Sequence, residues 1–332
     1  YLDGVFERNV SVNNGVGVGT FVAEDAIIEG NSTVRSRSGD TTTVFVDSET
    51  YGNITVKNGN GNDLFVMSNF GTLGKVNVNN GNGDTETVIE DDSLTASGFT
   101  LKNGAGQDSF QLLDSSVEGK LTINNGNGNT ETLLQNSWVG ISTLTGRVSD
   151  LAVKNGIGED LFLLDNTGVG RHANINHGNG GSASLIFDSG IGSNLLGKSQ
   201  NGNDEWVVEF SLVIGNTNIT TGNDSDAVWF DDSTFEGTTI VNTGNGNDGI
   251  LMDIDTDEGY DDPVVFEGRV SLIGGGGDDD FFLGAFEEPG AYNIFAGPLI
   301  VNGGGGFDSL DVMDNGNWFL STARDVSLED IY

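Results

Sequence analysis

The sequence predicts an all-β fold, a single right-handed parallel β-helix (β-solenoid) with about 22 residues per coil and roughly 13 coils. Three observations predict it. A Gly/Asn/Asp turn motif recurs thirteen times, mostly at steps of 22 residues, and such a fixed period is typical of a solenoid. Apolar residues recur at constant offsets from this motif. No segment of useful length keeps the helical period of about 3.6 residues.

The unit from Ile54 to Gly74 shows how one coil is built. Ile54 and Val56 alternate with polar residues, which predicts a strand with one buried face. The Asn/Gly run 58–63 predicts a turn, because Asn and Gly favour turns and left-handed backbone. Residues 64–67 predict a second strand, and a short third segment completes the coil.

Apolar residues form files when the coils are aligned on the second glycine position of the motif. The files seven and five positions before this glycine and six positions after it are predominantly apolar, so we expect them to form the core. The file five positions before it contains Val56, Val78, Leu101, Ile123, Val153, Ile175, Gly197, Ile219, Val241, Leu272 and Val301. Gly197 interrupts this file. Successive members are expected about 4.8 Å apart, the spacing of paired strands.

The file four positions after the glycine alternates in size. Its first nine members are Phe21, Thr43, Phe65, Thr87, Phe110, Thr132, Phe162, Ser184 and Trp206. Where this residue is aromatic, the turn residue two positions earlier is usually Asp, and where it is small, that residue is Thr or Ser. We interpret the alternation as a packing device, because aromatic rings at every coil would overfill the file.

The domain organisation follows from where the motif stops. We expect residues 1–314 to form the solenoid and residues 315–332 to be a C-terminal cap or a link to the next module, because an uncovered last coil exposes a sheet edge. Longer steps predict loops at Trp138–Arg147, Asp253–Asp262 and Glu287–Tyr292. Insertions in repeat proteins often carry binding function. The chain begins at Tyr1 without a signal-like segment, so we expect a piece of a longer protein.

Charge and composition restrict the partners. The chain has 50 acidic and 13 basic residues, a formal net charge of −37 and no cysteine. Such a field repels nucleic acid and other polyanions and attracts cations. The basic residues are judged too few and too scattered to form a cleft for a polyanion. No run of 18 apolar residues occurs, so neither nucleic-acid binding nor membrane insertion is expected.

Five aspartates occupy the same motif position in the last five coils that carry the motif. They are Asp204, Asp226, Asp248, Asp279 and Asp308. Carboxylates stacked about 5 Å apart repel by ~1 kcal/mol or more per pair. They either turn to solvent or share a hard cation, and Ca²⁺ suits oxygen ligands in a flexible geometry. The alternative is that they cap backbone amides of the turn and bind no ion.

A second candidate calcium site lies in the acidic loop that follows the eleventh motif. Asp253, Asp255 and Asp257 place carboxylates at alternate positions, as at the start of an EF-hand loop. The glycine of this segment, Gly259, comes one residue late, and no helix flanks it. A solvated acidic loop is the alternative.

Two resemblances bear on fold and function. The segments 58–66, 274–282 and 303–311 are similar to the calcium-binding nonapeptide G-G-x-G-x-D-x-U-x of RTX β-rolls. That resemblance implies calcium between successive turns, held by the motif Asp and turn carbonyls. RTX rolls place the motif at both turns of a coil, whereas this chain places it at one. Segments 241–248 and 297–304 resemble large Gly/Asn/Asp-rich β-solenoid repeat proteins of bacterial surfaces, including planctomycete types.

Three further sequence features are compatible with other functions, and the repeat itself accounts for most of them. Acid pairs at Asp91-Asp92, Asp231-Asp232 and Asp261-Asp262 are of the kind that glycan hydrolases of this fold use, but they share a turn file with single acids. His177 follows a file of asparagines and is interpreted as a substitute in an Asn ladder. Threonines such as Thr85 and Thr87 suggest an ice-binding face, which would need Thr at every coil.

We therefore expect a structural, adhesive or spacer module of a secreted or cell-surface bacterial protein, stabilised by Ca²⁺ and not an enzyme. Its expected partners are other domains of a larger chain, or a cell-surface or matrix protein or glycan. The alternative is a parallel β-helix that binds glycans or acts on polysaccharides as a lyase or hydrolase. A groove lined by convergent acids would favour the enzyme.

Overall fold

The computed structural model describes residues 1–142, 146–253, 262–284, 293–312, 317–320, 323–326 and 330–331. All the secondary-structure elements in these ranges are strands. Their parallel pairing forms a β-solenoid of about 13 turns with about 22 residues between equivalent positions, so the predicted fold class is confirmed. No helix long and apolar enough to cross a membrane is found in the described ranges.

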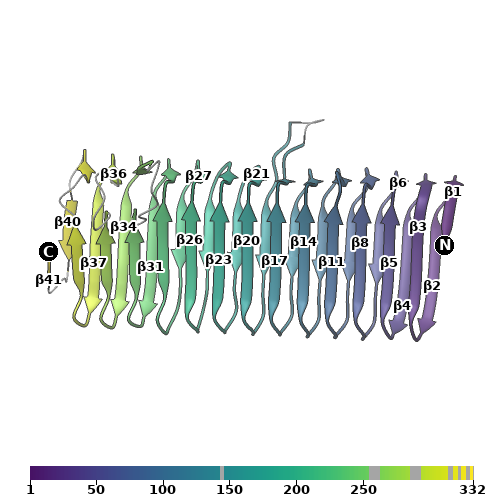
Figure 1. Ribbon diagram of the computed structural model, residues 1–332, viewed down its shortest axis with the longest axis horizontal. Helices are drawn as coiled ribbons and strands as arrows, with labels where there is room; N and C mark the ends of the chain where they lie inside the picture. The colour runs from purple at the N-terminus through teal and green to yellow at the C-terminus, as the bar shows by residue number, and fades with distance from the viewer. Residues whose placement is uncertain are drawn as a thin grey trace. The chain divides into compact units, whose positions relative to one another are not determined.

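The chain divides into two compact units. Unit 1 contains residues Tyr1–Leu161 and Asn166–Arg171, and unit 2 contains Phe162–Asp165 and His172–Tyr332. In each unit a typical turn adds two strands to one sheet, sheet A, and one strand to the other, sheet B. Figure 1 shows neighbouring sheet A strands of unit 1, such as β5, β8 and β11, side by side.

Apart from β1 to β4, the strands of unit 1 are four, six or two residues long, and each two-residue strand follows the six-residue strand of the same coil. Those of sheet B are β2 (Val10–Val16), β4 (Ser32–Ser38), β7 (Ile54–Lys57), β10 (Val76–Asn79), β13 (Phe99–Lys102), β16 (Leu121–Asn124) and β19 (Leu151–Lys154). Those of sheet A are β1 (Leu2–Phe6), β3 (Gly19–Ile28), β5 (Thr41–Val46), β6 (Glu49–Thr50), β8 (Asp63–Ser68), β9 (Gly71–Thr72), β11 (Thr85–Glu90), β12 (Leu94–Thr95), β14 (Asp108–Leu113), β15 (Ser116–Val117), β17 (Thr130–Gln135), β18 (Trp138–Val139) and β21 (Gly168–Val169). Strand β20 (Asp160–Asp165) is divided between the two units.

Unit 2 repeats the same plan. Its sheet B strands are β22 (Ala173–Asn176), β25 (Leu195–Lys198), β28 (Thr217–Thr220), β31 (Thr239–Asn245), β34 (Val270–Gly276), β37 (Leu299–Gly305) and β40 (Ala323–Val326). Its sheet A strands are β23 (Ser182–Phe187), β24 (Gly190–Ile191), β26 (Asp204–Glu209), β27 (Leu212–Val213), β29 (Ala227–Asp231), β30 (Thr234–Phe235), β32 (Gly249–Met252), β33 (Val264–Phe266), β35 (Asp280–Leu283), β36 (Asn293–Phe295), β38 (Ser309–Val312), β39 (Trp318–Phe319) and β41 (Asp330–Ile331).

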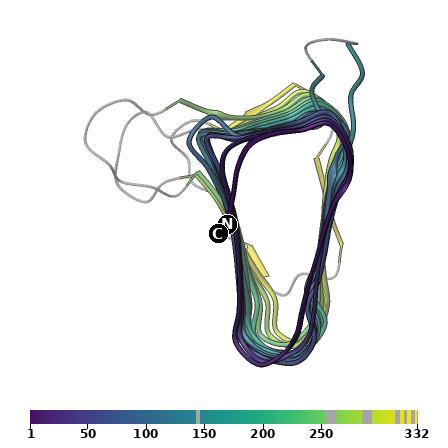
Figure 2. The same cartoon turned by 90° about the vertical axis from the view of Figure 1, so that its right-hand side faces the viewer.

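The predicted apolar files are real columns of directly paired residues. In sheet B of unit 1, Val56 pairs with Val78, Val78 with Leu101, and Leu101 with Ile123. All four side chains are buried. The turns of unit 1, purple to teal in Figure 2, overlie one another, so that like positions coincide from turn to turn.

The interruption at Gly197 in unit 2 has a packing cause. Gly197 pairs with Ile175 on one side and with Ile219 on the other, so it does stand in the core file. A Cβ atom at Gly197 would lie 2.5 Å from the ring of Trp206. The fully buried indole of Trp206 therefore takes the space that an aliphatic side chain fills in the other coils.

The alternation of large and small residues also has a packing cause. Thr43 pairs with Phe65, Phe65 with Thr87, and Thr87 with Phe110, and all four are buried. The hydroxyls of Thr43 and Thr87 have no hydrogen-bond partner. The size of these threonines, and not their hydrogen bonding, therefore accounts for their place in the file.

Two polar ladders stabilise the turns of unit 1. The side-chain amide of each asparagine donates to the next, over 2.9–3.0 Å, through Asn58, Asn80, Asn103, Asn125 and Asn155. At the other turn the backbone N–H of Ser93 donates to Ser115 Oγ, and that of Ser115 donates to Ser137 Oγ. Buried backbone donors are thus matched from coil to coil.

The turn position that carries Asp or Asn in successive coils has a left-handed backbone, which favours these residue types. Asp47, Asn69, Asp91 and Asp114 have φ between 46° and 55°, in the left-handed region that Asn and Asp tolerate better than most residues. The repeat-driven interpretation of Asp91 is therefore supported by its backbone conformation.

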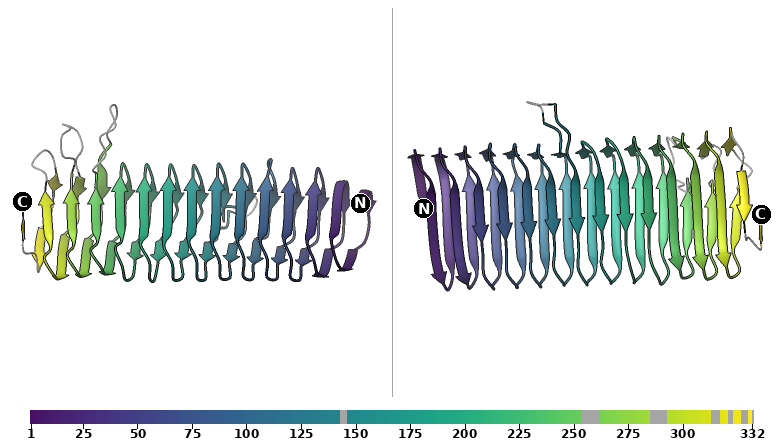
Figure 3. Two further views of the ribbon diagram at one scale, coloured as in Figure 1. Left: turned by 60° about the horizontal axis from the view of Figure 1, so that its bottom comes forward. Right: turned by 180° about the vertical axis from the view of Figure 1, so that it is seen from behind.

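The insertions and the tail are described in part. Residues 140–142 and 146–149 belong to an arm with an antiparallel bridge between Ile141 and Val148, and the teal parts of this arm project from the strands of unit 1 (Figure 3). The predicted loops at 253–262 and 287–292 lie outside the described residues except for Asp253 and Asp262. In the tail, β39, β40 and β41 pair with β36, β37 and β38. The domain boundary at residue 314 stays a prediction.

Substitutions at Thr87 test the packing interpretation. Thr87→Phe places a ring between Phe65 and Phe110, so we expect the free energy of unfolding to fall by about 1–3 kcal/mol. Thr87→Val removes a hydroxyl without a partner, so it should leave stability unchanged or slightly raised. Denaturant unfolding of both variants measures this. A loss as large for Val as for Phe would show that the hydroxyl, and not size, matters.

Candidate functional site

The five predicted calcium-ligating aspartates form a buried file in unit 2, here called the Asp file. Its members are Asp204, Asp226, Asp248, Asp279 and Asp308, and each is between 1% and 4% exposed. The backbone N–H of each member donates to the Oδ1 atom of the next, over 2.8, 2.9, 3.1 and 3.1 Å in chain order. One oxygen of each accepting carboxylate therefore caps the neighbouring coil, as the alternative of amide capping predicts.

The second carboxylate oxygen turns toward the inside of the coil. A Cβ atom at Gly274 would lie 2.3 Å from Asp279 Oδ2, and one at Gly303 would lie 2.3 Å from Asp308 Oδ2. The Oδ2 atoms of Asp248 and Asp279 are buried and accept no hydrogen bond. Glycine at 274 is thus what makes room for the inward carboxylate.

Burial dominates the electrostatics of the Asp file. It raises the pKa of Asp279 to about 7, against the opposing effect of the hydrogen bond from the Asp248 N–H. The negative charges of Asp248 and Asp308 raise this pKa further. Burial likewise raises the pKa of Asp226 and of Asp248. Carboxyl groups in this file therefore favour a proton or a cation over a bare negative charge.

The inner position beside the motif explains why unit 2 carries consecutive aspartates. Three positions before the motif glycine, unit 1 has the Asn ladder from Asn58 to Asn155, whereas unit 2 has His177, Ser199, Thr221, Thr243, Gly274 and Gly303. In the coils with Gly274 and Gly303, absence of a side chain gives the Asp carboxylate room to turn inward. The structure thereby relates two sequence patterns that analysis of the sequence treated separately.

Unit 1 alternates aspartate with threonine at the same motif position. The hydroxyl of Thr41 donates to Asp63 Oδ1 over 2.5 Å, and that of Thr85 donates to Asp108 Oδ1 over 2.7 Å. Burial raises the pKa of Asp108 to about 6, while the hydrogen bond from Thr85 opposes this rise. Each of these carboxylates thus has a neutral neighbour that donates to it, and like charges are kept two coils apart.

The donor set of the Asp file fits a hard cation. The groups that face the inner side of these turns are carboxylate and threonine oxygens, and Ca²⁺ binds through oxygen ligands. The orphaned Oδ2 atoms of Asp248 and Asp279 are the observation that favours an ion. Neighbouring members of the file, such as Asp248 and Asp279, would share it, and it would neutralise their charge. Within the described residues, three acidic oxygens within 4.8 Å of one another are found outside this file.

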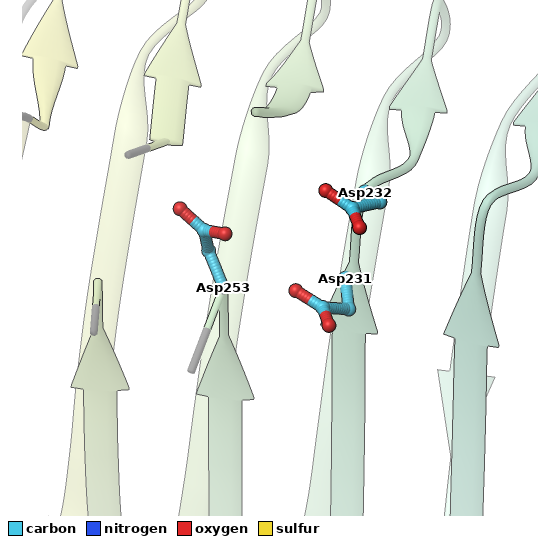
Figure 4. A group of neighbouring side chains, drawn as sticks. All are labelled: Asp231, Asp232 and Asp253. Carbon is cyan, nitrogen blue, oxygen red and sulfur yellow. The ribbon is translucent and has the colours of Figure 1, made fainter. Parts of the chain in front are cut away.

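A second acidic cluster joins residues that the sequence analysis assigned to different features. Asp231, Asp232 and Asp253 each offer an oxygen, and these atoms lie within 4.8 Å of one another (Figure 4). Phe230 pairs with Met252, so the next residues, Asp231 and Asp253, come to the ends of neighbouring strands. Asp253 is 0% exposed.

The geometry of this cluster is compatible with one ion. Ca²⁺ lies roughly 2.3–2.6 Å from its ligands, so oxygens no more than 4.8 Å apart can share it. Sequence reasoning placed Asp231-Asp232 in the repeat turn file and Asp253 in the acidic loop. The strand register was the signal that could have joined them. Asp255 and Asp257, the other predicted ligands of that loop, lie outside the described residues.

Two other sequence-level candidates lie in the interior. His177 Nε2 is 2.8 Å from Ser184 Oγ, but both residues are 0% exposed, so a substrate has no access to this pair. The Trp206 ring packs near the imidazole in an edge-to-face arrangement. Thr85 and Thr87 are also buried, so the ice-binding hypothesis is wrong for these threonines: they do not form an exposed face.

Comparison with known protein families, with curated proteins and with solved structures finds no match for this chain.

The raised pKa of Asp108 predicts a pH dependence of stability. A carboxyl whose pKa is higher in the folded chain than its unfolded value of about 3.9 stabilises the fold fully below that value. The contribution is lost as the pH rises through about 6. In EDTA we expect Asp108→Asn to be less sensitive than the parent chain between pH 4 and pH 7, by on the order of 1–3 kcal/mol.

Thermal unfolding across this pH range measures the effect. Asp114→Asn is the matched control, because Asp114 is exposed at a left-handed turn position where other coils carry Asn. If both variants keep the parent's pH profile, the buried carboxyl of Asp108 does not titrate as inferred.

Two glycines of β37 test the inward direction of the Asp carboxylates. Gly303→Ala places a methyl group 2.3 Å from Asp308 Oδ2, so the carboxylate must leave its position, and we expect a loss of about 1–3 kcal/mol. Gly305→Ala meets no atom within 4 Å and should be close to neutral. Denaturant unfolding separates the two. Equal effects would place the carboxylate elsewhere.

Proposed function

We propose that this chain is a structural β-solenoid module, with a spacer or adhesive role, of a secreted or cell-surface bacterial protein, and that Ca²⁺ at the Gly/Asp turns of unit 2 stabilises it. The observation that carries the proposal is the buried inward oxygen of Asp279, which accepts no hydrogen bond. An ionised carboxylate in this place destabilises the coil unless it gains a proton or a cation.

The organisation of the turns supports a structural role. The polar residues of the described turns are largely committed to contacts between coils: asparagine to asparagine, serine to backbone, and aspartate to backbone. Such contacts fix the spacing and register of successive coils. A module of this kind holds other domains of a larger chain apart, or presents a long surface to a cell-surface or matrix protein or glycan.

The acidic cluster favours one alternative function. Clustered aspartates perform acid–base chemistry in glycan hydrolysis, and Asp231, Asp232 and Asp253 are brought together here. An enzyme of this kind would release reducing ends from a polysaccharide, and Asp232→Asn would abolish that release. If the cluster is instead a calcium site, Asp232→Asn would weaken ion binding, and the parent chain would show no hydrolysis.

Calcium dependence of thermal stability tests the main proposal. We expect EDTA to lower the melting temperature of the parent chain at pH 7.5, because the buried carboxylates then lose their counter-charge. Saturating Ca²⁺ at about 100 times its dissociation constant should add roughly 2.7 kcal/mol. Asp279→Asn keeps an oxygen acceptor but removes the charge, so its melting temperature should differ less between Ca²⁺ and EDTA.

Asp188→Asn is the matched control. Asp188 is exposed at a left-handed turn position of unit 2 that lies outside the Asp file, and other coils carry Asn there, as at Asn69 and Asn166. Its calcium response should equal that of the parent. An identical melting temperature of the parent chain in Ca²⁺ and in EDTA would eliminate stabilising calcium, and an unchanged response in Asp279→Asn would move the ion away from the Asp file.

A further inference from the structure

The outward face of sheet B in unit 1 carries a file of basic residues. Strand pairing places Arg35 beside Lys57, Lys57 beside Asn79, Asn79 beside Lys102, Lys102 beside Asn124, and Asn124 beside Lys154. The four cationic side chains are exposed. From Lys57 onward a lysine recurs at every second strand, with an asparagine between. This set is called the basic file.

The strands that carry the basic file hold no acidic residue, and Asp150, which precedes β19, is paired with Arg171. These strands are β4, β7, β10, β13, β16 and β19. The parallel outward file two residues earlier is Thr33, Thr55, Asn77, Thr100, Thr122 and Ala152. Lys75 and Lys120 precede β10 and β16 and are exposed as well.

Local carboxylates do not neutralise this face. Arg171 forms an ion pair with Asp150 on the edge of this face, whereas no ion pair of Arg35, Lys57, Lys102 or Lys154 is found within the described residues. The lysines of the basic file therefore have no close ion-pair partner among those residues. The expectation that the basic residues are scattered is wrong for Arg35, Lys57, Lys102 and Lys154, because the coil period brings these four into one file.

We propose that this face binds a linear acidic polysaccharide along the basic file. Alternate strands are about 9.6 Å apart, twice the ordinary strand spacing of about 4.8 Å, so Lys57, Lys102 and Lys154 form a regular linear array of positive charge. A polymer with a carboxylate on its repeating unit meets several of these lysines at once. The threonines and asparagines beside them supply hydrogen bonds to sugar hydroxyls.

Binding at this face depends on several weak contacts acting together. One exposed ion pair contributes little, whereas linked contacts on one polymer add through effective concentration. At physiological salt, interactions beyond about 8 Å are largely screened, so the local face outweighs distant acids of the chain. The net charge of the whole chain therefore does not exclude an anionic ligand here.

A second copy of the chain fits the basic file less well. Unit 2 holds most of the acidic residues, but the outward acids of its sheet A strands form no regular array at every second strand. Asp165 and Glu209 lie two strands apart, Glu209 and Asp231 lie on adjacent strands, and Glu205 and Asp280 lie three strands apart. A repeating polymer matches the spacing of the lysines, and these acids do not.

Equilibrium binding to polygalacturonate tests the proposal, with its fully methyl-esterified form as the uncharged control. The buffer contains EDTA and about 20 mM salt, so calcium bridges to the acidic surface are absent and the result is independent of the proposed calcium sites. The temperature is kept below the melting transition in EDTA, as checked by circular dichroism. We expect binding of the charged polymer alone, lost on raising the salt to about 0.5 M.

The variant Lys57→Gln/Lys102→Gln/Lys154→Gln should bind at least tenfold more weakly. The matched control is Thr20→Glu/Thr42→Glu/Ser109→Glu, which changes the net charge equally at a sheet A file that already carries Glu86 and Glu131. It should bind within about twofold of the parent chain. Both variants alter outward side chains, so both should keep the parent's circular dichroism.

Three results would overturn the proposal. Equal affinity of the lysine variant and the parent chain removes the basic file from binding. Equal weakening in the glutamate control shows that net charge decides. Sedimentation that shows self-association of the parent chain without polymer, abolished in the lysine variant, assigns the face to a second copy.

Discussion

Parallel pairing in register is the constraint on which this structure depends. Each residue lies directly beside its equivalent in the neighbouring coil, so any buried polar group is repeated about every 4.8 Å. Apolar files meet this constraint easily, as Val56, Val78 and Leu101 do. Polar groups meet it only when each can both give and receive a hydrogen bond. An asparagine ladder satisfies that condition, and so does a hydroxyl beside a backbone N–H.

Carboxylates accept hydrogen bonds but do not donate them, so a file of aspartates cannot form such a ladder. The two units accommodate buried aspartate in different ways. In unit 1 threonine alternates with aspartate, so that Thr85 donates to Asp108 and no two carboxylates are adjacent in the motif file. In unit 2 each accepting carboxylate takes a backbone N–H from its neighbour. At Asp279 and Asp308 the second oxygen lies against Gly274 and Gly303, at the position that the Asn ladder occupies in unit 1. Burial is the main cause of the raised pKa of both Asp279 and Asp108, and at Asp279 the negative charges of Asp248 and Asp308 add to it. A cation has more to neutralise in unit 2.

The sequence was sufficient for the fold because the period and the apolar files carry the same information as the strand register. The core of sheet B could be assigned residue by residue from the spacing alone. Gly197 could not, because its cause is the indole of Trp206, nine residues away on another strand. The burial of His177 against Ser184 was equally hidden, since the periodicity shows which file a residue joins and not how deep that file lies. Asp231 and Asp253 belong to different sequence motifs, and a motif relates only residues that are near in sequence. These two residues are brought together by the pairing of neighbouring strands.

The same distinction applies to charge. A formal charge of −37 describes the chain as a sum, and from it a polyanionic partner looks excluded. In a solenoid, however, charge is distributed by file, because one offset within the repeat maps to one line on the surface. Lysine at every second coil gives Lys57, Lys102 and Lys154 one such line, while the acids occupy turn and sheet A files. At physiological salt each charge acts over about 8 Å. The file of lysines therefore determines which ligand binds to that face, and the net charge of the chain does not. Partner predictions for repeat proteins should therefore start from the charge of each file.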